Sequence, residues 1–209
     1  MAFSVPIASV LSGASARQLG YWRRRTSSSE PLLIPFAQRS GRYLYSWADI
    51  VALRSIVYLR QEKSLPRIRE AVRSLRKLEE SEWEHLAQYV LVRTTETIVV
   101  KTPKGEILDL ERAPGTVLEE VLMEDVLGSF EANGSRVAAL PRPRPYLSVN
   151  PGVLGGYPVI AGSRVPFHVV AALADEGAAP NDIVEIYPSV DPLGVPDAQD
   201  FAHQVALAA

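Results

Sequence analysis

The sequence predicts a mainly α protein with small β elements, an α+β fold in which two winged helix-turn-helix-like modules are joined by a small mixed middle segment. Apolar residues recur every three or four positions in several short stretches, as in amphipathic helices. Short β-rich runs flank Gly-containing turns between these stretches. A length of 209 residues, 47% of them hydrophobic, suits two small domains. We expect the first module at residues 1–78, the middle segment at 79–140 and the second module at 141–209.

Charge is divided unevenly between the two ends of the chain. Residues 1–78 hold 14 Lys and Arg residues against 4 Asp and Glu residues, a charge of +10, whereas residues 79–209 hold 8 against 20, a charge of −12. A basic half suggests contact with a polyanion such as DNA. Pairing of the two halves with each other is the alternative explanation.

Composition excludes several classes of chemistry. The chain has no Cys, so disulfides, Cys-ligated zinc, iron–sulfur clusters and thiol nucleophiles are excluded, and its three His residues equip it poorly for metal catalysis. We therefore predict no enzyme, no catalytic residue, no metal and no cofactor. The sequence shows neither a signal-peptide run nor a membrane-spanning stretch, so a cytoplasmic protein without membrane contact is expected.

The N-terminal part has the pattern of two short helices joined by a turn at Gly13. Ser15 can cap the second helix, whose Leu19 and Trp22 face inward. Arg17, Tyr21 and Arg24 are spaced by three and four residues and should share an outer stripe, flanked by Arg23 and Arg25. Arg and Tyr side chains of this kind can bind phosphates and base edges.

A hairpin and two longer helices should follow. The run QRSGR between two short extended pieces predicts a β-hairpin with Arg39 and Arg42 at its tip, which is the form of a wing. Ser46 can cap a helix with an apolar and a charged face, and Ser64 starts another helix with Pro66 in its first turn.

These residues resemble the winged-helix DNA-binding domain of MerR-type regulators over about residues 3–78. The resemblance is carried by Tyr21-Trp22, by the run from Gly41 to Ser46 and by the run from Ser64 to Arg69. It implies a homodimer that binds operator double-stranded DNA. The residues expected to contact DNA are Arg17, Tyr21, Arg23, Arg24, Arg39 and Arg42. Gly20 departs from the family pattern, and the family's metal-sensing cysteines are missing, so a metal sensor is not expected.

The middle segment should combine helices with one hairpin. A capping box at Ser81 and Glu84 predicts a helix of about three turns. Two β-rich runs around PKGE predict a hairpin, and a second amphipathic helix should turn Val117, Val121, Leu122 and Val126 inward. The acidic outer face of that helix is interpreted as solvated surface rather than an active site; it comprises Glu119, Glu120, Glu124 and Asp125. The Pro-alternating stretch AALPRPRPYL predicts an extended linker partly free of helix and sheet.

The C-terminal part begins with a Gly-rich stretch, GGYPVIAGSRVPFHVVAALADEG. It lacks the Lys and Ser/Thr of a phosphate-binding loop and the Gly spacing of a dinucleotide site. It therefore predicts a short strand at Pro158 to Ile160 between two Gly turns, then a helix ended by Gly177. Helices are also expected after Pro180 and around Phe201, and His168 is expected to be a packed or hydrogen-bonded residue.

This stretch closely resembles the small domain called DUF433 over about residues 146–205. The resemblance implies a winged-helix-like module of VapB-type antitoxins, which are encoded next to PIN-type ribonuclease toxins. Tyr157 and Ala161 stand where basic residues are common, which favours a toxin-holding or dimerising role over DNA contact. Toxin contacts are then expected at Arg164, Phe201 and Val205.

Together, these features predict an antitoxin of a type II toxin–antitoxin system that neutralises a PIN-type ribonuclease toxin and represses its own operon. The alternative is a MerR-like transcriptional regulator that responds to a small effector.

Overall fold

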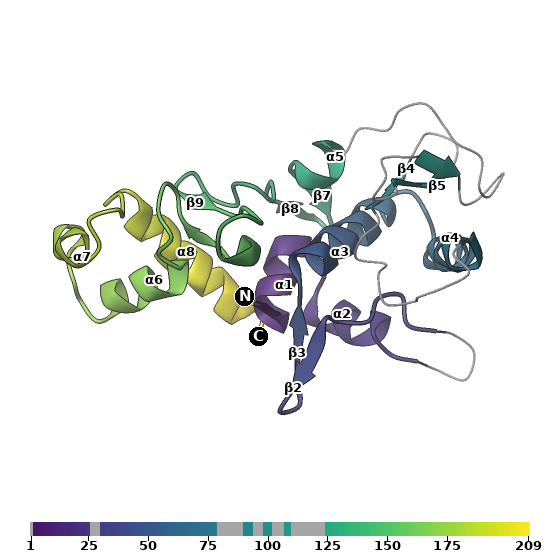
Figure 1. The fold of residues 1–209 in the computed structure, drawn as a ribbon, viewed down its shortest axis with the longest axis horizontal. Helices are drawn as coiled ribbons and strands as arrows, with labels where there is room; N and C mark the ends of the chain where they lie inside the picture. The colour runs from purple at the N-terminus through teal and green to yellow at the C-terminus, as the bar shows by residue number, and fades with distance from the viewer. Residues whose placement is uncertain (1, 26–29, 79–89, 94–97, 102–106, 110–123) are drawn as a thin grey trace.

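The computed structural model describes residues 2–25, 30–78, 90–93, 98–101, 107–109 and 124–209, and it has the predicted character, mainly α with small antiparallel sheets. Helices α1 to α4 lie on one side and helices α6 to α8 on the other, with α1 beside α8 in the middle (Figure 1). No helix of the described residues has the length and apolar character needed to cross a membrane.

The N-terminal module follows the predicted order of elements. Its elements are β1 (Phe3–Ser4), α1 (Val5–Ser12), α2 (Ala16–Trp22), β2 (Ala37–Arg39), β3 (Arg42–Tyr45), α3 (Trp47–Leu59) and α4 (Leu65–Leu78). The three strands form an antiparallel sheet in the order β1-β3-β2. The sequence did not predict β1, which comprises only two residues and continues directly into α1.

Side-chain caps fix where two of these helices begin. Ser15 accepts a hydrogen bond from the backbone N–H of Gln18, and the Gln18 side chain accepts one from the N–H of Ser15. Ser46 and Asp49 form the same reciprocal pair at the start of α3. Each box satisfies backbone donors that the first turn of a helix leaves unpaired.

Helix α3 is the centre of the N-terminal core. It is buried on all sides from Asp49 to Leu59, so the expected division into an apolar and a charged face is wrong for most of its length. The reason is that later segments of the chain cover its second face, including residues 124–137. Arg54, on this covered face, is fully buried.

The middle segment contributes small sheets and one short helix. Its described elements are β4 (Val90–Arg93), β5 (Ile98–Lys101), β6 (Ile107–Asp109), α5 (Glu124–Leu127), β7 (Phe130–Ala132) and β8 (Ser135–Val137). The hairpin predicted around PKGE is confirmed, because Lys101 of β5 faces Ile107 of β6 in antiparallel register. The helix predicted from Ser81 lies mostly outside the described residues, and its expected last part is the strand β4. The second predicted helix is described only from residue 124 on, where Val126 of α5 is buried as expected. Its expected end at Phe130 is wrong, because Phe130 begins the strand β7.

The C-terminal module has the short strand and the three helices that the sequence predicted, together with a strand and a 3-10 turn that it did not predict. Its elements are β9 (Leu147–Ser148), the 3-10 turn η2 (Leu154–Gly156), β10 (Val159–Ile160), α6 (Phe167–Asp175), α7 (Pro180–Ile186) and α8 (Gly194–Leu207). The turn glycines on both sides of β10 have positive φ, as does Gly177 beyond the end of α6. Helix α8 begins at Gly194, a few residues earlier than the stretch that predicted it.

The Pro-alternating stretch is not a free linker. Arg144 donates to Asp200 at 2.7 Å and to Gln204 at 2.8 Å, both on α8, and Leu140 is fully buried. Its backbone is not uniformly extended either, because the N–H of Arg142 donates to the carbonyl of Ala139 and that of Leu147 to the carbonyl of Arg144, which closes two turns. Contacts with α8, which the local sequence does not show, hold the stretch in place.

The two modules share one continuous hydrophobic core. Tyr157 of the C-terminal module stacks on Phe3 of β1 at 6.2 Å and on Phe167 of α6 at 5.9 Å between ring centroids. Gly156 lies so close to Trp47 that an added Cβ would sit 2.6 Å from its ring atom Cε3. The border expected near residue 140 therefore does not separate two independently packed bodies.

Candidate functional site

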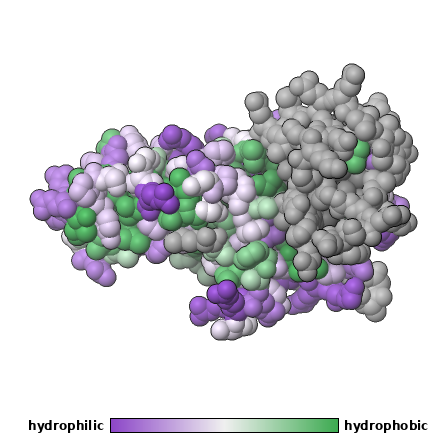
Figure 2. All heavy atoms as spheres, in the orientation of Figure 1, coloured by the Kyte–Doolittle hydropathy of each residue, from purple (hydrophilic) through white to green (hydrophobic). Residues whose placement is uncertain are grey.

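The basic surface predicted on the N-terminal module consists of α2, its following loop and the β2–β3 hairpin. Arg17, Tyr21 and Arg24 are exposed on or just after α2, and Arg39 and Arg42 are exposed at the hairpin tip. The hairpin and α2 lie next to each other in Figure 1, and hydrophilic residues gather at the hairpin tip in Figure 2. The fold thus places on one side of the N-terminal module residues that are 15 to 25 positions apart in the sequence.

Helix α2 ends earlier than the predicted stripe required. Its last residue is Trp22, so Arg24 lies in the following loop rather than on the helix itself. The end is fixed by the backbone, because the carbonyl of Trp22 accepts a hydrogen bond from the N–H of Leu32 at 2.7 Å. Arg24 remains exposed beside the helix.

Arg23 has a different role from its neighbours. Its guanidinium lies 4.0 Å from the ring centroid of Tyr43 and is 3.5 Å from the hydroxyl of Tyr45, both on β3. Burial raises the pKa of the Tyr45 hydroxyl, so this group stays protonated at neutral pH. Arg23 therefore orients the end of α2 against the hairpin, and we assign it as a positioning residue.

Helix α4 adds a residue that the sequence did not single out. The guanidinium of Arg69 lies 5.4 Å from the ring centroid of Tyr21 and donates to the carbonyl of Glu30 at 2.8 Å. It holds Tyr21 on one side and the loop before the hairpin on the other. The run PRIRE carried a signal for this residue, since it places a basic residue beside the apolar Ile68.

The basic surface keeps its positive charge. In the part of the chain that the structure describes, Arg17, Arg24, Arg39 and Arg42 form no ion pair, whereas Arg25 is paired with Glu30 at 3.2 Å.

Asp49, at the base of the hairpin, accepts from the N–H groups of Ser46 and Phe36 at 2.7 and 3.0 Å. Burial nonetheless raises the pKa of the Asp49 carboxyl.

The residues predicted to hold a toxin are placed differently from one another. Arg164 is exposed and Val205 is half-buried on α8. Phe201 is fully buried, with its ring 4.8 Å from Phe167 in an edge-to-face contact. Phe201 is therefore a core residue rather than a contact residue, because α8 packs onto α6 on the side of this ring. His168 is exposed and hydrogen-bonded through Nδ1 to the Tyr157 hydroxyl at 3.2 Å.

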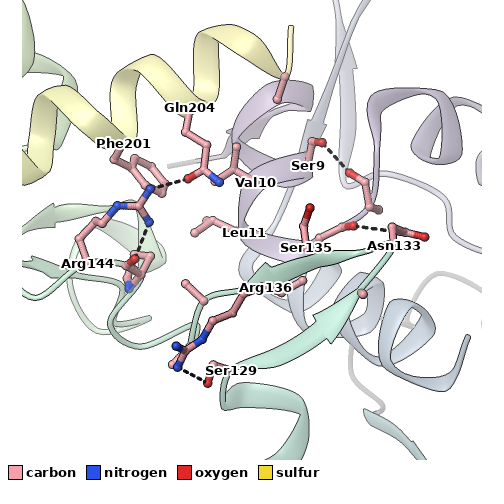
Figure 3. A pocket seen from close by; sticks show the side chains of 18 of the residues that line it. Ser9, Val10, Leu11, Ser129, Asn133, Ser135, Arg136, Arg144, Phe201 and Gln204 are labelled. Atoms are coloured by element: carbon pink, nitrogen blue, oxygen red, sulfur yellow. Dashed lines mark hydrogen bonds between the residues drawn. The ribbon is translucent and has the colours of Figure 1, made fainter. Parts of the chain in front are cut away.

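An open groove lies between the modules, and we call it the inter-module groove. It has a volume of about 1080 Å³ and is bordered by the α1–α2 turn, the β7–β8 hairpin, residues 142–145 and the end of α8. In Figure 3, Arg144 and Gln204 border it on the side of α8, and Arg136 borders it on the side of the β7–β8 hairpin. No three His, Asp or Glu side chains of the described residues come together as a metal site would require.

The sequence prediction missed the hairpin that forms one wall of this groove. Asn133 and Gly134 at its turn have φ values of 53° and 75°. Two successive positive φ values are the mark of the tight turn that Asn-Gly favours. This dipeptide was therefore the signal that could have found β7 and β8.

Comparison with known proteins gives a family for the C-terminal module. Residues 147–202 match a family model described as a protein of unknown function, DUF433. This part of the chain is a DUF433 domain. The DUF433 domain covers about a quarter of the chain and includes β9 to most of α8.

Two further proteins are similar to this chain. The uncharacterized protein y4eO of Sinorhizobium fredii is 34% identical over 82 residues, which are 39% of this chain and 37% of that relative. The crystal structure of Rv2018 from Mycobacterium tuberculosis covers 94% of this chain and 96% of its own, at 15% identity and a TM-score of 0.49.

Proposed function

We propose that the N-terminal module binds double-stranded DNA, with α2 in the major groove and the β2–β3 hairpin against the neighbouring backbone. One observation carries the proposal: Arg17 and Tyr21 are exposed on α2, and Arg39 and Arg42 are exposed at the tip of the hairpin whose strand β3 contacts the end of α2 through Arg23. Helices with such side chains enter the major groove, while basic loops contact phosphates.

The contacts around α2 support this assignment. Arg23 and Arg69 are engaged with Tyr43 and Tyr21, so they fix the helix and its tyrosine, and the remaining arginines are left to face a ligand. A prearranged surface loses less side-chain freedom on binding than a mobile one.

DNA binding is tested by selecting duplexes from a random library with the full chain and measuring affinity for the selected duplex at several salt concentrations. Arg17→Ala and Arg42→Ala should each lower the slope of log affinity against log salt by about 1, because each removes one phosphate contact. Arg164→Ala, on the C-terminal module, removes an equal charge and should leave the slope unchanged. An unchanged slope in the Arg17 and Arg42 variants contradicts the assignment.

We further propose that the protein is a homodimeric antitoxin, in which the DUF433 domain holds a PIN-type ribonuclease toxin while the DNA-binding surface represses the operon. The proposal rests on the sequence resemblance of residues 146–205 to a module of VapB-type antitoxins, in the part of the chain where residues 147–202 match a family model of unknown function. Arg164 is exposed on this domain and suits an acidic toxin surface.

The toxin proposal is tested by expressing the adjacent open reading frame alone and together with this protein. Growth arrest that is relieved by coexpression, with a complex that copurifies, is the expected result. Arg164→Ala should weaken that complex without changing the DNA salt slope. A harmless neighbour that never copurifies contradicts the antitoxin proposal and leaves the effector-responsive regulator as the alternative.

A further inference from the structure

We propose that the inter-module groove is a binding site for a small amphipathic organic anion, a molecule with an apolar body and a carboxylate or sulfonate group at one end. Its volume of about 1080 Å³ lies at the upper end of the range of small-molecule sites. It is lined by segments from both modules, so a ligand there contacts the N-terminal core and α8 together.

The charge of the lining points to an anion. Arg136, Arg142 and Arg144 line the groove, and none of the Asp and Glu residues that the structure describes is part of its lining. Arg144 is neutralised, because its guanidinium is paired with Asp200 at 2.7 Å and also donates to Gln204.

Arg136 and Arg142 are not neutralised. Arg136 donates to the Ser129 hydroxyl and Arg142 to the carbonyl of Pro145, each at 3.2 Å, and neither has an ion-pair partner among the described residues. Each guanidinium has five N–H donors in a planar fork, so both retain donors for a carboxylate or sulfonate.

The middle of the groove points to an apolar body. Val10 of α1 lies there between the two polar sides (Figure 3), and Leu207 at the end of α8, which is 76% exposed, adds to this surface. The neighbouring Ala132 and Ala139 are small and leave room beside them. A free inorganic anion would not use these contacts, and an uncharged apolar molecule would not use the arginines.

The groove also reaches the start of α2. Ser15, the cap of that helix, and Gln18, its capping partner, both line the groove. A ligand would therefore contact the end of the helix proposed to enter DNA. An effect of the ligand on DNA affinity rests on the proposed function, whereas the binding site itself does not.

The test uses the full chain without DNA and two dyes of nearly the same shape. 8-Anilinonaphthalene-1-sulfonate carries the anion, and N-phenyl-1-naphthylamine lacks it. We expect the sulfonate to bind at one saturable site, and Arg136→Ala and Arg142→Ala each to weaken its binding about tenfold, because each removes hydrogen bonds between charged groups. The uncharged dye should bind wild type and variants alike.

Arg73→Ala is the matched control, since it removes one exposed positive charge from α4, outside the groove lining. It should leave the affinity for the sulfonate unchanged, and circular dichroism should show the same fold in all variants because the replaced side chains are exposed. Equal losses for both dyes, equal losses in the control, or no saturable site overturns the proposal. Retained sulfonate binding by a chain that selects no duplex overturns the proposed function and leaves the site intact.

Discussion

Replacing Arg54 by Met tests whether a single buried cation joins three parts of the chain. The Arg54 guanidinium donates to the carbonyls of Leu11 and Gly128, each at 2.6 Å, and to that of Val126 at 2.8 Å. Leu11 lies in the last turn of α1, where carbonyls lack a helical donor, and the other two lie at the end of α5. A positive charge at the end of a helix also opposes the negative end of its dipole.

The magnitude follows from two opposing terms. Burial lowers the pKa of Arg54 from 12.5 to about 10, which corresponds to a desolvation cost of about 3 kcal/mol and leaves the side chain charged at neutral pH. Met avoids this cost but leaves three buried carbonyl oxygens without a donor, at about 1–3 kcal/mol each. Subtracting the first term from the second leaves a net loss of about 0–6 kcal/mol, and we expect Arg54→Met to lower the free energy of unfolding by an amount near the middle of that range, about 3 kcal/mol.

Urea unfolding followed by circular dichroism measures this change at neutral pH. Arg60→Met is the matched control, because Arg60 follows the same helix but is exposed, and its unfolding free energy should change by no more than about 0.5 kcal/mol. An Arg54→Met protein that unfolds at the same urea concentration as the wild type refutes the reasoning. It would mean that the three carbonyls need no donor from Arg54.

Three further predictions concern Asp49 and two turn glycines. The pKa of the Asp49 carboxyl is raised in the folded state, so the folded protein favours the protonated carboxyl. This protonation stabilises the fold fully below the unfolded pKa of about 3.8, and the stabilisation is lost as pH rises through the folded pKa. Asp49→Asn should therefore gain stability relative to wild type across that pH range in urea unfolding, and a parallel pH dependence of the two proteins contradicts this. Gly162→Ala should cost about 1–2 kcal/mol of unfolding free energy, since φ is +79° but the space beside Gly162 is open. Gly156→Ala should cost about 1–3 kcal/mol more in thermal unfolding, because φ is +86° and the new Cβ would also meet a Trp ring; equal costs at both glycines would show that the ring gives way freely.

Much of the fold could be predicted because its signals are local. Ser15 and Ser46 start helices through side chains that bond within three residues, and Gly177 marks the end of α6. The hairpin with Arg39 and Arg42 at its tip was predicted from turn chemistry in five residues. Periodicity and turns are properties of short stretches, so the sequence carries them directly.

What could not be predicted depends on contacts between distant segments. Arg54 resembles a surface residue in its own helix, and only the segment at Val126 to Gly128 makes it a core residue. Likewise, the buried position of Phe201 requires Phe167 of another helix. The division of roles between Arg23 and its neighbour Arg24 depends on Tyr43, which lies about twenty residues further along the chain. Local spacing gives these arginines the same expected role.

The shared core limits how a ligand of one module can influence the other. Phe167 of the DUF433 domain contacts Tyr157, which stacks on Phe3 of β1, and Phe3 is paired with Tyr45 of β3 in the sheet. Tyr45 is in turn the hydrogen-bond partner of Arg23, at the end of α2. Because close-packed contacts of this kind resist rotation, the DUF433 domain is held at a fixed position relative to the proposed DNA surface. A partner bound to this domain would therefore not alter DNA binding through a hinge at the Pro-rich stretch. It would act through its own bulk and charge near the duplex, or by changing the distance between the two DNA-binding surfaces of a dimer.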